Sequence, residues 1–446
     1  MLRSELGAVE LVQPAALVAG EVRVPGDKSI AHRALMLAAI ADGESTISGL
    51  PEGEDVRATV ACLRAIGVRL SPRAAGSRAG RALIVSPPPW AGRGAGWPFS
   101  TPHGSLDCAN SGTTMRLLLG LLAGSRISAS LDGDASLRRR PMSRVIEPLR
   151  LMGAHIQSEQ GHAPLSVAGS RLQGRRHSLA IASAQVKSAI LLAGLSASGP
   201  TTVIEPLQTR DHSERLLSAM GADISGRGST IELRPSHRPL SALDIAVPGD
   251  FSSAAFWMAA AALRPGWSVT VRGVGLNPTR TAFASLLRQM GAEVQIDVSA
   301  DGAEPLGSIR VVGRLLRAIE LGAAEVARAI DEIPALLAVA TQAEGVTSVS
   351  GAAELRLKES DRLSTMATGL RQMGARIEER PDGISIYGPA KLRGAVVDSS
   401  GDHRIAMALA VAALTGSEPS TIVDADCVAV SYPDFFSQLR GIVDAA

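Results

Sequence analysis

One pattern recurs six times along this chain: a short polar turn followed at once by an apolar helix rich in alanine and leucine. The copies read PGDKSIAHRALMLAAIA from Pro25, NSGTTMRLLLGLLAG from Asn110, SAQVKSAILLAGLSA from Ser183, PGDFSSAAFWMAAAA from Pro248, DEIPALLAVA from Asp331 and GDHRIAMALAVAA from Gly401. They begin roughly 65 to 85 residues apart, which is typical of a repeated supersecondary unit. Helices that are apolar almost all round are predicted to be buried.

A second repeated element supports the first. It is a helix that ends in a Met-Gly-Ala type of turn and leads into a strand, as in LRAIGVRL from Leu63, LRLMGAHI from Leu149, LLSAMGADI from Leu216, LLRQMGAEV from Leu286 and LRQMGARI from Leu370. The glycine supplies the left-handed residue that closes a helix. Together the two elements predict an α/β (α+β) fold of six repeats, three in each of two domains. The alternative is an ordinary α/β protein whose turns are similar by chance.

Composition narrows the functional classes. The 446 residues include 45 basic and 43 acidic ones, so the net charge is +2, and aromatic residues make up only 3%. A nearly neutral chain with few aromatic rings is poorly suited to coat nucleic acid by charge or to stack bases. Any strongly basic site must therefore be local.

The cysteines and the N-terminal residues indicate the cellular compartment in which the protein is expected. Cys62, Cys108 and Cys427 lie far apart and form neither a zinc motif nor a disulfide framework, which suits a reducing compartment. Glu5 and Glu10 interrupt any signal-peptide core, and no apolar stretch is long enough to span a membrane. We expect a cytoplasmic protein with no membrane partner. The segment 71–105 is rich in proline and glycine, and we expect a strand pair and a loop there.

The polar turns point to anions. A helix N-terminus carries unpaired N–H groups and a partial positive charge, so several of them in one place form an anion site. Asp27 can cap the first helix, where Lys28, Ser29 and Arg33 follow. Cations there oppose the helix dipole unless an anion arrives, which favours function over an exposed turn with solvated charges. Lys187, at the start of the third copy, is counted with the same anion-binding cations.

Two further turns offer donors. Gly112 allows a ligand to approach the backbone closely, and Thr113 or Thr114 can cap the helix that follows. Ser183 and Gln185 offer a hydroxyl and an amide at another helix start, where Ser183 is equally well explained as a simple cap.

The later motifs leave alternatives open. Asp331 at the opening of a helix is explained either by capping or by catalysis. Lys358 and Arg362 lie four apart on what the pattern predicts to be one helix, which either supplies catalytic partners or is a salt-bridged surface helix. His403 and Arg404 open a strongly apolar helix, where both can contact an anion, or His403 can be a core histidine. The run of arginines 138–140 precedes a proline expected in the first turn of a helix, and is otherwise a solvated loop.

With these motifs in hand, the chain resembles the 5-enolpyruvylshikimate-3-phosphate synthase (3-phosphoshikimate 1-carboxyvinyltransferase) family over roughly 22–439. The resemblance rests on PGDKSIAHRAL, NSGTTMR, GDASLRRRPM, SAQVKSAILLAG, TRDHSERLL, NPTRT, DEIPALLAVA, LRLKESDRL and GDHRIAMA in this order. It implies the two-domain enolpyruvyl transferase fold, in which each domain has three βαβαββ repeats with buried parallel helices and the active site lies in the cleft between them. Residues 1–23 and 247–446 are expected to form one domain and 24–246 the other, with crossings near 23 and 247.

The same resemblance implies a reaction. The carboxyvinyl (enolpyruvyl) group of phosphoenolpyruvate passes to the 5-hydroxyl of shikimate 3-phosphate through a tetrahedral intermediate, by addition and elimination, and phosphate is released. This step belongs to the shikimate pathway to chorismate and the aromatic amino acids. No metal and no organic cofactor is implied, the herbicide glyphosate is an expected inhibitor, and we expect a monomer with no nucleic-acid partner.

The resemblance also assigns residues by motif. Contacts to shikimate 3-phosphate are expected from Lys28, Ser29, Arg33, Ser183, Ala184, Gln185, Arg210, Asp331 and Lys358. Contacts to phosphoenolpyruvate are expected from Lys28, Gly112 (through its backbone), Arg140, Gln185, Arg362 and Arg404. Asp331 resembles the base near the attacking hydroxyl, with Lys358 beside it, and the further catalytic candidates are Glu359, Lys28 and His403.

The chain departs from the family pattern at two points. Some members carry a lysine before the C-terminal Pro-Asp/Glu-Phe segment, where this chain has residues 429–432, AVSY, so that contact is not expected here. The motifs resemble the branch that tolerates glyphosate, in which an alanine often replaces Gly112. Glycine at this position predicts an enzyme that glyphosate inhibits.

Two other functions compete with this interpretation. The sister transferase acting on UDP-N-acetylglucosamine shares fold and donor, but it usually has a cysteine in the loop corresponding to residues 134–140, where this chain has none. A nucleic-acid-binding protein using the arginines at 138–140 is opposed by the low aromatic content and the near-zero net charge.

Overall fold

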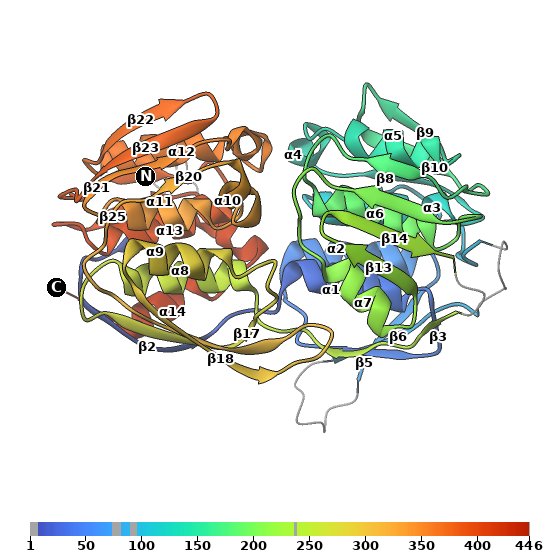
Figure 1. Ribbon diagram of the computed structural model, residues 1–446, viewed down its shortest axis with the longest axis horizontal. Coiled ribbons are helices and arrows are strands. Elements are labelled where there is room, and N and C mark those ends of the chain that lie inside the picture. The colour runs from blue at the N-terminus through green and yellow to red at the C-terminus, as the bar shows by residue number, and fades with distance from the viewer. Residues whose placement is uncertain (1–7, 74–81, 90–95, 236–238, 446) are drawn as a thin grey trace. The chain divides into compact units, whose positions relative to one another are not determined.

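The computed structural model describes residues 8–73, 82–89, 96–235 and 239–445, and within these the chain forms two compact units (Figure 1). Unit 1 comprises residues 8–25, 248–301 and 305–445, and unit 2 comprises 26–247 and 302–304. The chain therefore leaves unit 1 after Pro25 and returns to it at Pro248. The short excursion of 302–304 into unit 2 was not indicated by the sequence.

Residues 106–168 show the repeat of unit 2 most clearly. The elements are, in order, β7 (Leu106–Asp107), α3 (Gly112–Ala123), β8 (Ser128–Asp132), the short α4 (Ala135–Arg138), α5 (Ser143–Leu151), β9 (His155–Glu159) and β10 (His162–Ala168). β7 runs parallel to β8, with Leu106 opposite Leu131, and β10 is antiparallel to both β8 and β9. This is one βαβαββ unit with sheet order β7-β8-β10-β9.

The other repeats of unit 2 follow the same plan. One contains β11 (Arg176–Ser178), α6 (Ala184–Gly194), β12 (Thr201–Ile204), α7 (His212–Ala219), β13 (Asp223–Arg227) and β14 (Thr230–Arg234). The other contains α1 (Lys28–Ala38), β4 (Ser45–Ser48), α2 (Glu54–Ala65), β5 (Arg69–Pro72) and β6 (Ala82–Ser86). Its parallel edge strand comes from the end of the unit, because β16 (Asp244–Ala246) pairs with β4. A small ribbon of β3 (Ala41–Asp42) and β15 (Leu240–Ser241) lies apart.

Unit 1 repeats the arrangement. Its elements are β2 (Ala15–Arg23), α8 (Phe251–Ala262), β17 (Ser268–Gly275), α9 (Ala282–Met290), β18 (Glu293–Ala300), β19 (Leu306–Val312), β20 (Glu320–Leu321), α10 (Ala323–Arg328), α11 (Ile333–Ala340), β21 (Gly345–Val349), η1 (Ala353–Leu357), α12 (Arg362–Gln372), β22 (Arg376–Arg380), β23 (Gly383–Gly388), β24 (Val396–Asp398), α13 (His403–Ala413), β25 (Ser420–Val423), η2 (Ala425–Val430), α14 (Phe435–Ile442) and β26 (Val443–Ala445). The N-terminal strand β2 runs parallel to β17, and β1 (Glu10–Val12) closes the sheet of β24 and β25. The N-terminal strands β1 and β2 thus complete sheets whose other strands come from much later in the sequence. The predicted fold class is confirmed.

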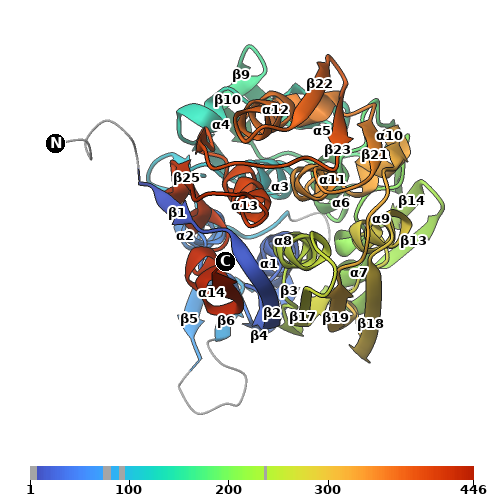
Figure 2. The same cartoon turned by 90° about the vertical axis from the view of Figure 1, so that its left-hand side faces the viewer.

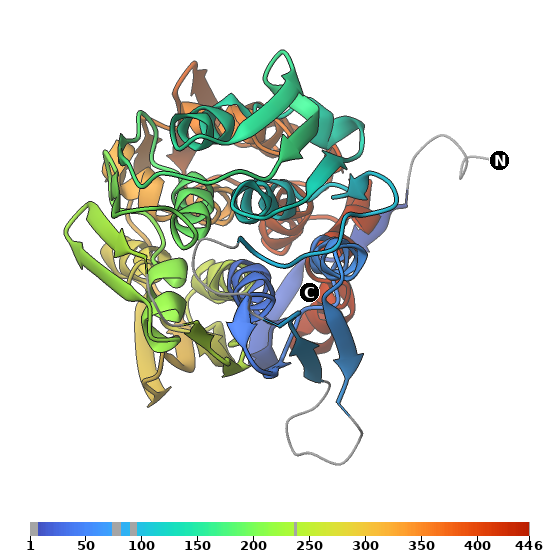
Figure 3. The ribbon, with the colours of Figure 1, turned by 90° about the vertical axis from the view of Figure 1, so that its right-hand side faces the viewer.

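Each polar turn of the sequence leads into a helix in the middle of its unit. α8, α11 and α13 pack together inside unit 1 (Figure 2), and α1, α3 and α6 do so inside unit 2 (Figure 3). All twelve residues of α8 are buried, as are all those of α11 and α13. The predicted burial of these helices is confirmed, and among the residues described no helix is both long and apolar enough to cross a bilayer.

The Met-Gly-Ala turns also have the predicted form. Their glycines, at 67, 153, 221, 291 and 374, have φ between 83° and 107°, and each is followed by a strand. In the segment 71–105, β5 and β6 pair as expected, whereas residues 74–81 and 90–95 lie outside the described part of the chain. Cys62 and Cys108 are buried free thiols.

Candidate active site

In the first turn of α1, Lys28 is paired with the carboxylate of Asp55. Asp27 caps the helix by accepting from the Ile30 N–H at 2.9 Å, as predicted. Lys28 Nζ lies 2.6 Å from Asp55 Oδ2 at the start of α2, and one-fifth of the Lys28 side chain remains exposed. The ammonium is thus partly neutralised yet accessible. The sequence did not reveal Asp55 as its partner, because 27 residues separate the two.

Arg33 lies deeper on the same helix. Its guanidinium donates to Ser213 Oγ at 2.9 Å and to Ser188 Oγ at 2.8 Å, and also to the carbonyls of Ser29 and Ala184. Only 3% of the residue is exposed, and burial lowers its pKa to about 10, so it stays charged at neutral pH. Arg33 therefore joins α1 to the first turns of α6 and α7.

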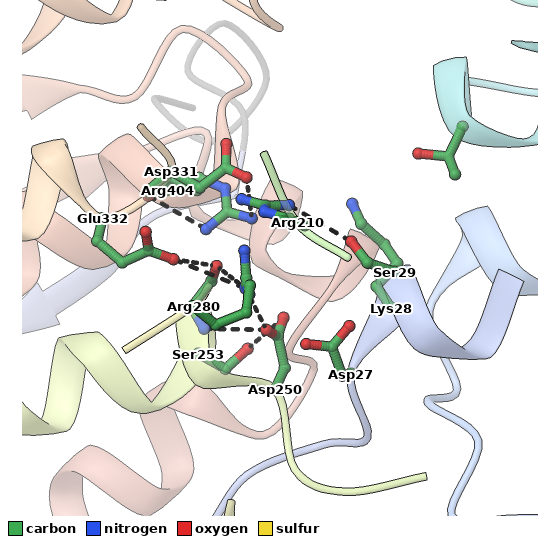
Figure 4. A network of polar contacts seen from close by, with 12 residues as sticks. Asp27, Lys28, Ser29, Arg210, Asp250, Ser253, Arg280, Asp331, Glu332 and Arg404 are labelled. Atoms are coloured by element: carbon green, nitrogen blue, oxygen red, sulfur yellow. Dashed lines mark hydrogen bonds and ion pairs between the residues drawn. The ribbon is translucent and has the colours of Figure 1, made fainter. Parts of the chain in front are cut away.

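Hydroxyl and amide groups at the start of α6 lie beside this arginine. Ser183 caps α6 by accepting from the Val186 N–H at 3.4 Å, which confirms its capping role. Arg210, in the loop before α7, donates to Ser29 Oγ at 3.4 Å (Figure 4). The predicted contacts of unit 2 at 29, 33, 183, 184 and 210 are thus brought together.

The start of α3 forms a second cationic corner. Ser111, and not Thr113 or Thr114, caps the helix by accepting from the Thr114 N–H at 3.1 Å, so the predicted cap is wrong by two or three residues. The sequence offered three adjacent hydroxyls, and only the extended residue before the helix can cap it.

Gly112 is the first residue of α3 and is enclosed by guanidinium groups. A Cβ atom placed on Gly112 would lie 2.8 Å from Arg116 Nη1 and 3.5 Å from Arg140 Nη1. Arg116 also donates to Gln185 Oε1 at 2.5 Å, and Arg140 donates to Asn110 Oδ1 at 2.6 Å. Two arginines beside an unblocked helix N-terminus suit a phosphate or a carboxylate.

Lys187 does not belong to this set. Its Nζ lies 2.9 Å from Glu205 Oε2 and 2.7 Å from Glu214 Oε1, and only 1% of its side chain is exposed. The prediction that it helps to hold an external anion is therefore wrong. Its position on α6, one turn after Ser183, turns the side chain into the interior, where two carboxylates neutralise it.

The arginine run at 138–140 is divided. Arg138 forms an ion pair with Asp132, whereas Arg140 turns to the Asn110 loop. The helix after Pro141 begins only at Ser143, so the expected proline in its first turn is not found.

Unit 1 holds a compact charge cluster. Arg362 Nη1 lies 3.2 Å from Asp331 Oδ1, its Nη2 lies 2.6 Å from Glu359 Oε2, and its Nε lies 2.8 Å from Asp402 Oδ2. Arg404 Nη1 donates to the Asp331 carbonyl at 3.2 Å, and its Nη2 lies 3.8 Å from Asp331 Oδ2. The predicted residues at 331, 359, 362 and 404 therefore meet, and Asp402 joins them as a residue that the sequence analysis missed.

Electrostatics tune this cluster. Burial opposes ionisation of Asp402, but the Arg362 guanidinium outweighs it, so the pKa of Asp402 is lowered. Arg362 is buried and surrounded by carboxylates, which raise its pKa far above the usual range. His403, at the first position of α13, is 3% exposed beside Asp402.

Lys358 does not share a helix with Arg362. η1 ends at Leu357, Lys358 has an extended backbone, and α12 begins at Arg362, so the predicted continuous helix is wrong. Asp361 caps α12 by accepting from the Ser364 N–H, which favours a new helix over continuation. Burial lowers the pKa of Lys358, and Asp331 opposes that shift.

The second PGD turn has a structural network of its own. Arg280 Nη2 donates to Asp250 Oδ1 at 3.3 Å (Figure 4). It also donates to Ser252 Oγ at 2.7 Å, and Ser252 donates to Glu332. The Glu332 carboxylate is thus committed to α8, and it forms no cap on α11. Of the two carboxylates at the opening of α11, Asp331 alone belongs to the cluster with Arg362 and Arg404.

Comparisons with known proteins identify the family of this chain. The family model described as EPSP synthase (3-phosphoshikimate 1-carboxyvinyltransferase) matches residues 12–439. A 3-phosphoshikimate 1-carboxyvinyltransferase of Synechococcus sp. (strain WH7803) is 50% identical over 428 residues, covering 94% of this chain and 95% of that one. The protein of the same name from Gloeobacter violaceus is 48% identical, covering 98% and 99%.

Solved structures give the same result. An EPSP synthase structure from Acinetobacter baumannii superposes with a TM-score of 0.84 at 42% identity, covering 98% of each chain. Family model, relatives and fold agree over nearly the whole length, and the chain belongs to the EPSP synthase (3-phosphoshikimate 1-carboxyvinyltransferase) family.

Proposed function

We propose that this chain transfers the carboxyvinyl group of phosphoenolpyruvate to the 5-hydroxyl of shikimate 3-phosphate and releases inorganic phosphate. The observation that carries the proposal is the corner at Gly112, where two guanidinium groups flank a helix N-terminus. Both substrates bear a phosphate and a carboxylate, and such a corner favours these groups over neutral ligands.

Shikimate 3-phosphate is the proposed ligand of the hydroxyl-rich turns. The contributing residues are Lys28, Ser29, Arg33, Ser183, Ala184, Gln185 and Arg210 of unit 2, with Asp331 and Lys358 of unit 1. Support comes from the hydrogen bonds that already join Arg33 to the Ala184 carbonyl and Arg210 to Ser29 Oγ. Arg33 supplies buried positive charge and fixes the two turns that present these donors.

Phosphoenolpyruvate is the proposed ligand of the guanidinium groups. Its set comprises Lys28, Gly112, Arg140 and Gln185 of unit 2 and Arg362 and Arg404 of unit 1. Arg116, which touches Gln185, strengthens the charge at this corner. Arginine suits the role because its planar fork matches phosphate and carboxylate oxygens.

The proposed chemistry is addition followed by elimination. The 5-hydroxyl oxygen attacks C2 of phosphoenolpyruvate, Asp331 takes the hydroxyl proton, and C3 gains a proton to become a methyl group. In the second step C3 loses a proton, the double bond returns, and the C2–O bond to phosphate breaks. Lys358 stands beside the base, while Glu359, Lys28 and His403 are the proposed groups for protons at C3 and at the leaving phosphate.

A phosphate-release assay tests this function. The purified chain is mixed with phosphoenolpyruvate and either shikimate 3-phosphate or UDP-N-acetylglucosamine, without added metal. We expect release with shikimate 3-phosphate only, and its loss in Asp331→Ala but not in Asp297→Ala, an exposed aspartate of β18 in the same unit. Release with the nucleotide sugar only would establish the sister activity, and release with neither would refute both.

The remaining expectations belong to the same proposal. Glyphosate is the proposed inhibitor at the phosphoenolpyruvate set, and a monomer in the cytoplasm stays the expected state. The nucleic-acid alternative loses its main support, because Arg138 is paired with Asp132 and Arg140 with Asn110.

A further inference from the structure

A buried network of polar groups connects three helices of unit 2. His32 Nδ1 on α1 lies 2.6 Å from Thr59 Oγ1 on α2, and Thr59 Oγ1 lies 2.7 Å from Thr114 Oγ1 on α3. Thr114 Oγ1 lies 2.8 Å from Ser111 Oγ. His32, Thr59 and Thr114 are 0% exposed and Ser111 is 2% exposed, so water does not substitute for these contacts.

Only one assignment of donors and acceptors is consistent for the hydrogen bonds of this buried polar network. Thr114 donates to Ser111 Oγ, whose lone pairs also accept the Thr114 N–H. Thr114 must then accept from Thr59, and Thr59 must accept from His32 Nδ1–H. Burial lowers the pKa of His32 to about 3, so the ring is neutral at working pH.

The other ring nitrogen of His32 fits this order. His32 Nε2 is buried without a hydrogen-bond partner among the described residues. With the proton on Nδ1, Nε2 is a bare acceptor, whereas the opposite tautomer would bury an unpaired N–H, which costs more.

The buried polar network reaches two residues of the proposed phosphoenolpyruvate set, Gly112 and Lys28. Ser111 caps α3 immediately before Gly112. The Thr114 hydroxyl also donates to the Asp55 carbonyl at 3.3 Å, sharing its one proton with Ser111 Oγ, and the Asp55 carboxylate holds Lys28 at 2.6 Å. The four linked residues are buried, so they act on a ligand only through these two groups.

We propose that Thr59, with His32 and Thr114, forms a positioning network that sets Lys28 and the Ser111–Gly112 turn relative to each other for binding of phosphoenolpyruvate. This inference rests on the proposed function and adds residues that none of the sequence motifs assigned to the site. A role that is merely structural would lower stability without distinguishing the two substrates. A positioning role affects phosphoenolpyruvate more than shikimate 3-phosphate, because Lys28 is proposed to contact both substrates whereas Gly112 is proposed to contact phosphoenolpyruvate alone.

The test compares substitutions at Thr59. Thr59→Val keeps the shape and removes the hydroxyl, Thr59→Ser keeps the hydroxyl, and Thr59→Cys retains only a weak donor. Thr201→Val is the matched control, because Thr201 is also 0% exposed and its hydroxyl has no partner among the described residues.

We expect Thr59→Val to raise the KM for phosphoenolpyruvate by about tenfold, the effect of one unsatisfied buried hydrogen-bonding group. The KM for shikimate 3-phosphate should rise clearly less, since the network reaches only Lys28 among its proposed contacts and Arg33 holds the turns that carry most of the others. Thr59→Ser should restore the unmodified values, Thr59→Cys should lie between, and Thr201→Val should change neither KM. Equal changes in both KM values, or no rescue by serine, would overturn the proposal.

A second measurement does not depend on catalysis. Nitrogen-15 spectra of the histidine rings should show His32 neutral and protonated on Nδ1 from about pH 5 to 8, as its lowered pKa requires. A ring that titrates in this range, or one protonated on Nε2, would overturn the network even in a fully active protein. If the unmodified chain releases no phosphate, the proposed function has failed. In that case these spectra, together with the calorimetric Kd for phosphoenolpyruvate, decide whether the positioning network is correct.

Discussion

Replacing Lys187 by methionine should destabilise unit 2 strongly. The lysine joins Glu205 and Glu214, and the Lys187 and Glu205 side chains are each 1% exposed. Methionine fills a similar space but leaves two carboxylates without their cation, and breaking a buried pair from one side costs about 3–5 kcal/mol. For a unit of this size that loss lowers Tm by about 10 °C.

The loss should depend on pH. Burial raises the pKa of Glu214, and Lys187 counteracts that shift, so the variant should raise it further. A carboxyl whose pKa is higher in the folded state holds more protons when folded, so stability falls as the pH rises through the folded pKa. We therefore expect Lys187→Met to lose more stability at about pH 8 than at about pH 5.

Urea unfolding followed by circular dichroism at both pH values measures this effect. Arg314→Met is the matched control, since the Arg314–Glu293 pair is half-exposed and should contribute less than about 1 kcal/mol. Adding Glu205→Gln to Lys187→Met should recover part of the loss, because it removes one of the stranded charges. A loss below about 1 kcal/mol, or an equal loss at both pH values, would refute the reasoning.

Three predictions concern the site itself. Gly112→Ala places a Cβ 2.8 Å from Arg116 Nη1, so steady-state kinetics should show a larger rise in the glyphosate inhibition constant than in the KM for phosphoenolpyruvate, and equal rises would contradict this. Asp331→Asn should lower kcat about 100-fold as the loss of a general base, with Asp297→Asn unchanged; a kcat within about twofold of the unmodified chain would refute the assignment. Because burial lowers the pKa of Lys358, the alkaline fall of kcat/KM for shikimate 3-phosphate should move to higher pH in Lys358→Arg, and an unmoved limb would show that Lys358 does not cause it.

The features of the fold that depend only on residues close together in the sequence could be predicted. The burial of α8 follows from its composition, and the caps by Asp27 and Ser183 follow from residue types just before an apolar run. Strand exchange could not be predicted in the same way. β16 pairs with β4 through Ile245 and Ile47, and nothing in either short strand specifies so distant a partner.

The same limit explains the errors within the site. The sequence motifs identified the cationic residues, but the partners of these residues lie far away in the sequence. Asp55 pairs with Lys28, and Asp402, 40 residues on, pairs with Arg362. Lys187 shows the consequence. A lysine in the first turn of a helix has the same local pattern whether it faces a ligand or two buried carboxylates, and only tertiary packing decides.

The placement of Asp331 connects binding with catalysis on the proposed function. Its carboxylate lies 3.2 Å from Arg362 Nη1 and 3.8 Å from Arg404 Nη2, the two guanidinium groups proposed to hold phosphoenolpyruvate. A substrate anion that binds these arginines must compete with Asp331 for them. A carboxylate that loses two cationic neighbours takes up a proton more readily, so the ligand that occupies the arginines also prepares the base.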